Sequence, residues 1–186
     1  MNFYLSKKEI DKLKNNLTTT NQNAKLALSK SKSLLKITDG ILANRDNKWL
    51  DFILDWADKN IIQEKTNFPK NKEELSKAKH ISLRWNRLKL LPKEFFRLTQ
   101  LEVLELNNNA LEILPSEIGN LKKLKKLNLN INSLKTLPKE IINLKRLEVL
   151  NIKNNKYLEL DNEQISWLIE LKNNGCDLIY DKYKFN

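Results

Sequence analysis

The chain has 186 residues, 40% of them hydrophobic and 31% charged, which is ordinary for a globular protein and allows one sizeable unit or two modest ones. A single cysteine excludes an intramolecular disulfide framework. One histidine and one cysteine also argue against a Cys/His metal cluster, a catalytic triad and a bound cofactor. The formal charge of +11 favours anionic partners without saying whether they are nucleic acid, membrane or protein.

No segment has the pattern of a membrane-targeting sequence. The first residues, MNFYLSKKEIDKLKNN, lack an apolar core of signal-peptide length. No apolar run approaches the ~20 residues that span a bilayer. We therefore expect a cytoplasmic protein, with export by a route that leaves no cleavable signal as the open alternative.

Residues 1–45 form a basic region with nine Lys and Arg against three acidic residues. Ser6 and Glu9 make a capping-box pattern that predicts a helix over about 6–17. A second apolar stripe predicts a helix over about 22–43. Three interpretations are open: the region folds back as an additional cap, packs against a partner or a second copy, or lies on an anionic membrane.

Residues 46–74 are predicted to form an N-terminal helical cap and its lead-in. The segment NKWLDFILDWADKN, from Asn47 to about Asn60, has apolar residues at i, i+3, i+4 and i+7. These are Trp49, Phe52, Ile53 and Trp56. A polar NKEE segment then leads into the region that follows.

Residues 75–160 contain four units of a 23-residue repeat, which begin at Leu75, Leu98, Leu121 and Leu144. Alternating apolar residues predict one short strand per unit, with the apolar side chains pointing inward. The inward columns are Ile81, Leu104, Leu127 and Leu150, then Leu83, Leu106, Leu129 and Ile152. An asparagine follows each strand, at Asn86, Asn109, Asn132 and Asn155. We expect these asparagines to be structural, because an amide side chain bonds backbone groups that a turn would otherwise leave buried and unpaired.

These units resemble the leucine-rich repeat family, whose core pattern is LxxLxLxxN. The LPxxI endings at Leu114-Pro115…Ile118 and Leu137-Pro138…Ile141 are similar to the 23-residue intracellular class. The first unit departs from the pattern at Ala78 and Phe95. The resemblance implies an α/β solenoid: a short arc with a parallel concave sheet, an N-terminal helical arm and helical caps like those of small bacterial members.

Residues 161–186 are predicted to form a C-terminal cap. Asp161 replaces the expected proline and is a good helix N-cap. The helix would place Ile165, Trp167, Leu168 and Ile169 around one face and end at Asn174-Gly175. CDLIY then predicts a closing strand, with Cys176 as a buried cap residue.

The outward strand positions define the predicted partner-binding surface, the concave face. They are His80, Ser82, Arg84, Trp85, Val103, Glu105, Asn107, Asn108, Lys126, Asn128, Asn130, Ile131, Val149, Asn151, Lys153 and Asn154. This polar, amide-rich mixture suits recognition of a protein surface. It lacks the paired carboxylates or positioned base that hydrolysis needs, and no separate catalytic domain accompanies Cys176, so we expect no enzyme.

Trp85 has two competing interpretations. Because the repeat does not require an indole in that column, Trp85 and Arg84 are candidate interface anchors. Alternatively, the indole packs under the N-terminal cap. His80 is interpreted as an ordinary surface residue rather than a pH switch.

A lysine ridge supports an alternative function. Its residues are Lys122, Lys123, Lys125, Lys126, Lys145 and Arg146. With the basic arm, it could bind nucleic acid or another anionic surface, although no aromatics interleave for base stacking. The leading prediction is a non-enzymatic protein–protein interaction module, a monomer or weak oligomer, for example a bacterial adaptor, regulator or immunity-type protein.

Overall fold

The computed structural model describes residues 25, 29–30, 47–61 and 67–181. The chain divides into two compact units, Met1–Lys48 and Trp49–Asn186. In the first unit, Lys25, Ser29 and Lys30 are helical and exposed. The rest of the predicted helices over 6–17 and 22–43 lies outside the described residues, so the three interpretations of this region stay predictions.

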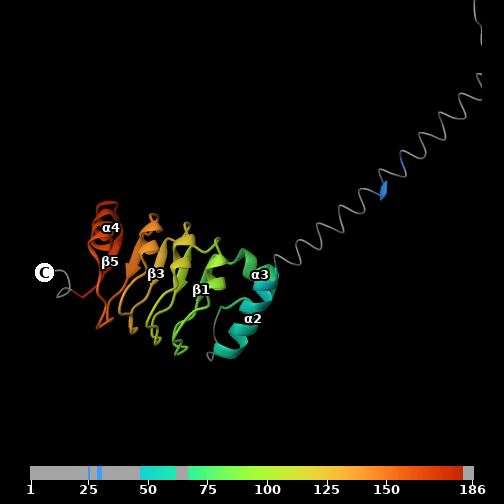
Figure 1. Cartoon of the computed structure of the whole chain (residues 1–186), viewed down its shortest axis with the longest axis horizontal. Coiled ribbons are helices and arrows are strands. Elements are labelled where there is room, and N and C mark those ends of the chain that lie inside the picture. Colours follow the sequence, from blue (N-terminus) through green and yellow to red (C-terminus); the bar gives the residue numbers. More distant parts are fainter. Residues whose placement is uncertain (1–24, 26–28, 31–46, 62–66, 182–186) are drawn as a thin grey trace, which may run out of the picture. The chain divides into compact units, whose positions relative to one another are not determined.

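The second unit is built on a five-stranded parallel sheet whose strands follow one another in chain order (Figure 1). The strands are β1 (His80–Ser82), β2 (Val103–Glu105), β3 (Lys126–Asn128), β4 (Val149–Asn151) and β5 (Asp177–Ile179). The pairing register places residues 23 positions apart opposite each other between β1 and β4, as with Leu104 and Leu127. The repeat therefore forms a short α/β solenoid, and the predicted fold class is confirmed.

Three short 3-10 helices carry the chain back after the Leu-Pro pairs. They are η1 (Lys93–Arg97), η2 (Ser116–Asn120) and η3 (Lys139–Asn143). A proline precedes each one in extended conformation, where its missing N–H removes no ladder bond. At Gly119, a Cβ would lie 2.6 Å from the backbone oxygen of Glu140, so η2 and η3 approach too closely for any side chain there.

The core is continuous from one cap to the other. Both predicted inward columns, which begin with Ile81 and Leu83, are buried in all four units. The leucines before the prolines and the apolar residues of the 3-10 helices, such as Phe95 and Ile118, complete it. Each unit buries its apolar face against the next, which is why the array needs caps at its ends.

The asparagine column forms a hydrogen-bond ladder between successive units. Asn109 Oδ1 accepts from the backbone N–H of Asn86 and of Leu88, each at 3.0 Å. Its Nδ2 donates to the carbonyls of Leu83 at 2.8 Å and Leu106 at 2.9 Å. Asn132 and Asn155 repeat this arrangement one and two units later. The predicted structural role of these asparagines is confirmed.

The N-terminal cap consists of α2 (Lys48–Asn60) and α3 (Lys72–Lys77). The predicted apolar stripe of α2 is wrong at Phe52, which is 48% exposed. The buried residues are Leu50, Ile53 and Ala57, so the helix is rotated towards a second stripe. Trp49 and Trp56 flank it, and the Trp56 ring meets Phe95 edge-on at 6.3 Å between centroids.

Helix α3 occupies part of the segment expected to be a polar lead-in. Asn71 caps it: its Oδ1 accepts from the backbone N–H of Glu74 at 2.9 Å, and its Nδ2 donates to the Glu74 carboxylate at 2.7 Å. Leu75 is fully buried within this helix. The first repeat unit therefore begins in the cap rather than in a regular connection.

The C-terminal cap consists of α4 (Asn162–Asn173) and the strand β5. Asp161 caps α4 in a capping box with Gln164, as the N-cap prediction requires. The predicted apolar face is wrong at Ile169, which is 56% exposed. Gln164 is buried in the cap, where its Nε2 donates to the carbonyl of Leu137 at 2.8 Å.

Candidate functional site

The concave-face residues that lie on the strands contact mainly other parts of the protein. Ser82 is only 8% exposed, so its expected availability to a partner is wrong; its backbone N–H donates to Asn67 Oδ1 at 2.8 Å, beside the first strand. His80 Nε2 lies 3.5 Å from a carboxylate oxygen of Glu105. Val103 and Val149 are half-buried, whereas Lys126 is exposed.

The two strand asparagines of the concave face also serve the fold. Asn128 Oδ1 accepts from the backbone N–H of Asn130, and Asn151 Oδ1 accepts from that of Lys153, each at 3.1 Å. These side chains shape the turns that follow their strands. Their acceptor oxygens are therefore less available to a partner than the sequence suggests.

The third residue after each of the strands β1 to β4 adopts a left-handed backbone conformation. The column consists of Trp85 (φ 64°), Asn108 (φ 57°), Ile131 (φ 53°) and Asn154 (φ 59°). Backbone bonds to the next turn hold this shape, for example from Asn108 N–H to the carbonyl of Asn130 at 2.9 Å and from Ile131 N–H to that of Lys153 at 3.1 Å. Asparagine tolerates such a position, whereas a β-branched residue at positive φ is a genuine outlier.

Trp85 and Ile131 therefore occupy positions that do not suit them. A non-glycine residue in this conformation is strained by roughly 1–2 kcal/mol. Trp85 is 58% exposed and Ile131 is 45% exposed. Burial of the side chain therefore does not fully offset the backbone strain at either position. The interpretation in which Trp85 packs under the N-terminal cap is wrong.

Charges beside the sheet are partly paired. Glu102 lies 3.1 Å from Lys125 and 3.2 Å from Lys79. Hydrogen bonds from Lys125 and then Lys79 hold the pKa of the Glu102 carboxyl below its ordinary value.

The lysine ridge is also partly engaged. Lys123 donates to Gln100 Oε1 at 2.7 Å, Lys125 pairs with Glu102, and Lys145 pairs with Glu170 at 2.5 Å. This leaves fewer free cations on the ridge than its sequence suggests.

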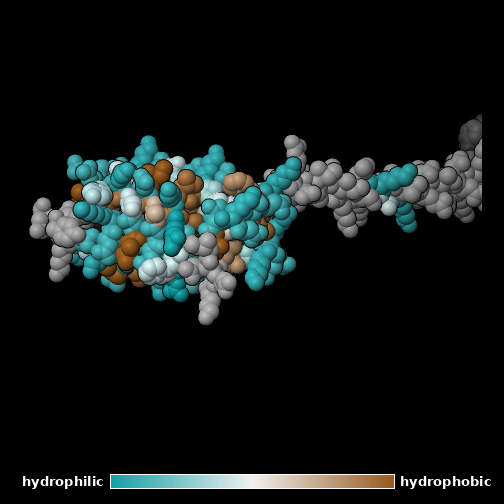
Figure 2. Space-filling view, turned by 90° about the horizontal axis from the view of Figure 1, so that it is seen from below, coloured by the Kyte–Doolittle hydropathy of each residue, from teal (hydrophilic) through white to brown (hydrophobic). Residues whose placement is uncertain are grey.

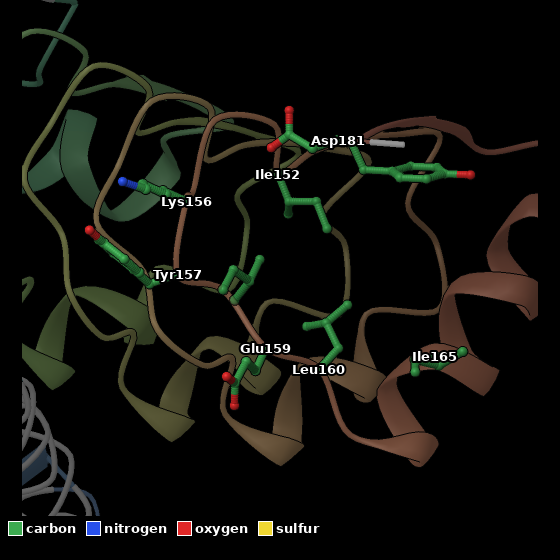
Figure 3. A pocket seen from close by; sticks show the side chains of 9 residues that line it. Ile152, Lys156, Tyr157, Glu159, Leu160, Ile165 and Asp181 are labelled. Carbon is green, nitrogen blue, oxygen red and sulfur yellow. The ribbon is translucent and has the colours of Figure 1, made fainter. Parts of the chain in front are cut away.

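A cavity of about 500 Å³ lies at the C-terminal end of the array (Figure 3). Its lining includes the part of the fourth unit that departs from the repeat. There, Leu158 N–H donates to the carbonyl of Asn155 at 3.1 Å, and the buried leucine stands one residue later than in the other units. Leu158 is buried, and Tyr157, which takes the column of Leu134, is 63% exposed. In Figure 3, Ile152 and Leu160 lie centrally, with Lys156 and Tyr157 to one side and Ile165 to the other.

Cys176 is buried, as predicted. Burial, followed by the charge of Asp177, raises the pKa of its thiol above the ordinary value, and a backbone hydrogen bond with Leu150 opposes this. A thiol with a raised pKa is a poor nucleophile at neutral pH.

Within 25, 29–30, 47–61 and 67–181, no three His, Cys, Asp or Glu side chains are grouped so as to hold a metal ion. Across those same residues, no helix is both long enough and apolar enough to cross a membrane.

Comparison with known proteins agrees with the repeat geometry. The family model for the leucine rich repeat matches residues 76–134. No curated protein matches the chain. A leucine-rich repeat protein of Leptospira interrogans is 37% identical with a TM-score of 0.48, over 61% of this chain and 28% of that one. A plant peptide hormone receptor, RGFR1 in complex with RGF2, is 39% identical with a TM-score of 0.39, over 49% of this chain and 14% of that one.

The chain thus spans less than a third of the length of either solved protein. Leucine-rich repeats are generally binding scaffolds rather than enzymes. The 23-residue columns, the parallel strands, the asparagine ladder and the family model lead to one conclusion: the chain contains an array of leucine-rich repeats.

Proposed function

We propose that this chain is a protein-binding module that uses its concave face. The observation that carries the proposal is the exposure of Trp85 and Ile131 beside the sheet, at positions where the backbone favours asparagine. Exposed aromatic and arginine side chains are common energetic anchors of interfaces, and Arg84 adjoins Trp85. The described residues offer no charge arrangement suited to hydrolysis, so binding is the activity that they support best.

The finer roles rest on the sequence. An adaptor, a regulator and an immunity-type protein that occludes its partner would all use such a surface. A cytoplasmic location and a monomeric or weakly oligomeric state likewise stay predictions. So does the alternative of binding an anionic surface: half of the lysine ridge is already engaged, and the basic arm lies outside the described residues.

The proposal is tested by capturing proteins from the source cell with the tagged full chain. We compare the wild type with a concave-face variant, Arg84→Ala/Trp85→Ala, and with a matched variant outside that face, Lys93→Ala/Phe52→Ala, whose residues lie on η1 and α2. The expected result is a captured protein that the concave-face variant loses and the matched variant retains. Retention by both variants would contradict the choice of face.

A further inference from the structure

Exposed apolar side chains gather in the connections that follow the strands. We define the connection face as residues 84–90, 107–113, 130–136 and 153–159, which lead from β1, β2, β3 and β4 towards the far side of the solenoid. Seven large hydrophobic side chains are exposed among the described residues, and five of them belong to this face. They are Trp85, Leu90, Ile113, Ile131 and Tyr157. The other two lie on the helices of the caps.

The connections stack side by side through backbone hydrogen bonds. Ala110 N–H donates to the carbonyl of Leu88, and Ser133 N–H donates to that of Leu111, each at 2.9 Å. The connection face is therefore a fixed surface rather than a set of separate loops (Figure 1). Seen from below, the molecule shows separate hydrophobic areas in a mostly hydrophilic surface (Figure 2).

The charge of this face is strongly one-sided. Its cationic side chains are Arg84, Arg87, Lys89, Lys135, Lys153 and Lys156, and its anionic side chains are Glu112 and Glu159. Lys135 pairs with Glu112 at 3.0 Å, and Lys156 lies 5.1 Å from the centre of the Tyr157 ring. The other four cations make no ion pair with a described residue. They are available to a partner that brings carboxylates.

Two positions of the connection face are also strained. Trp85 and Ile131 carry large apolar side chains on a backbone in the left-handed conformation. In the same column, the other two units have asparagine, at Asn108 and Asn154, which tolerates this conformation. Strained and exposed apolar residues are disadvantages for an isolated protein, and such strain gathers at functional sites. By contrast, Asn128 and Asn151 on the strands of the concave face use their side-chain oxygens in hydrogen bonds to the turns that follow.

We infer that the connection face binds an acidic protein segment that carries large apolar side chains, with Trp85 and Ile131 as its principal anchors. The inference rests on the proposed function and deepens it by extending the binding surface from the concave face along the connections and by naming the partner's chemistry. Carboxylates of the segment pair with Arg84, Arg87 and their neighbours. Its apolar side chains cover Trp85 and Ile131 and reach the cavity beside Tyr157.

The probe is a displayed library of random peptides of about 16 residues, long enough to cross four connections that are ~4.8 Å apart as either a helix or a strand. The full chain is used for selection, and the enriched peptides are then titrated. We expect enriched peptides that combine Asp and Glu with aromatic or large aliphatic residues. Their affinity should fall as ionic strength rises, because the cations are exposed.

Matched variants locate the site. Trp85→Asn/Ile131→Asn should weaken the enriched peptides at least about tenfold, since each side chain is an anchor. Phe52→Asn/Ile169→Asn makes the same kind of change at exposed apolar residues of the caps and should leave peptide affinity within about twofold. Both variants are first checked for a cooperative unfolding transition that shows a folded protein under the binding conditions, so that a loss of binding is not a loss of fold.

Three results would overturn the inference. One is the enrichment of neutral or basic peptides, or of no peptide at all. If the chain still captures a protein through its concave face, this result would leave the proposed function standing. Another is a loss of affinity in Phe52→Asn/Ile169→Asn that equals or exceeds the loss in Trp85→Asn/Ile131→Asn. The third is tight binding of a single-stranded oligonucleotide that the anchor variant loses while no acidic peptide is enriched, which would assign the face to nucleic acid.

Discussion

Two adjacent columns of the same turns have opposite characters. The column of Asn86, Asn109, Asn132 and Asn155 holds one residue type in every unit and bonds to backbone groups. The column just before it holds Trp85, Asn108, Ile131 and Asn154, all in a left-handed conformation. The fold dictates the side chain of the first column, whereas it dictates only the backbone shape of the second. The second column is therefore where residue choice can serve binding at a modest cost in stability.

The largest expected effect belongs to the fixed column. Asn132→Ala removes the partners of the Leu111 N–H and of the Leu106 and Leu129 carbonyls. Because each buried group left unsatisfied costs about 1–3 kcal/mol, we expect the free energy of unfolding to fall by at least about 3 kcal/mol, measured by denaturant titration.

The control for that change is Asn107→Ala, at an asparagine of a connection whose side chain has no hydrogen bond with the described residues. Its effect should stay within about 0.5 kcal/mol, as for ordinary surface substitutions. Equal losses at positions 107 and 132 would show that the ladder is not what stabilises the turns.

The next effect lies on the far side of the solenoid, where the fold again leaves no choice. Gly119→Ala places a Cβ 2.6 Å from the backbone oxygen of Glu140, so η2 and η3 must separate. We expect a loss of about 1–3 kcal/mol in unfolding free energy, as for other overpacked sites. Ser116→Ala, at an exposed position of the same 3-10 helix, should change little, and an unchanged Gly119→Ala would contradict the close approach.

A smaller effect tests the variable column directly. Asn108→Ile puts a β-branched residue at φ 57° in a half-exposed position, so we expect a loss of roughly 1–2 kcal/mol in unfolding free energy. The measurement is again a denaturant titration, with Glu112→Gln, an exposed residue of the same connection, as the reference. A stabilised Asn108→Ile would mean that this turn does not disfavour isoleucine.

The smallest effect concerns pH. The pKa of Glu102 lies below its ordinary value in the folded protein because Lys125 and Lys79 bond to the carboxylate. The contribution of this carboxylate to the stability of the folded protein is therefore present above the unfolded pKa and is lost as pH falls through the folded pKa. Unfolding midpoints of Glu102→Gln and the wild type should converge as the pH is lowered through that range. A difference that persists at low pH would point to a cause other than the carboxylate charge.

The sequence predicts a structural feature more accurately when its pattern is repeated more often along the chain. The inward columns and the ladder asparagines recur every 23 residues, so four copies reinforce each prediction. The buried face of α2 differs from the predicted one because two overlapping stripes share Ile53 in one short helix, and periodicity does not choose between Phe52 and the pair Leu50 and Ala57.

Other features of the structure have sequence signals of their own. The spacing of Asn71 and Glu74 is a capping pattern that marks α3, and Asn108 and Asn154 in one column indicate a left-handed position. Tyr157 in a leucine column marks the shifted turn beside the cavity. The availability of Ser82 and of the strand asparagines, in contrast, depends on tertiary hydrogen bonds that no periodicity encodes.

The central claim is that the fold does not require the large apolar side chains at positions 85 and 131. Its most direct test is the free energy of unfolding of Trp85→Asn/Ile131→Asn, measured by denaturant titration. Relief of backbone strain should leave this variant at least as stable as the wild type, with a gain on the order of 1 kcal/mol. A loss of about 2 kcal/mol or more would contradict the claim, because it would show that these side chains stabilise the solenoid itself.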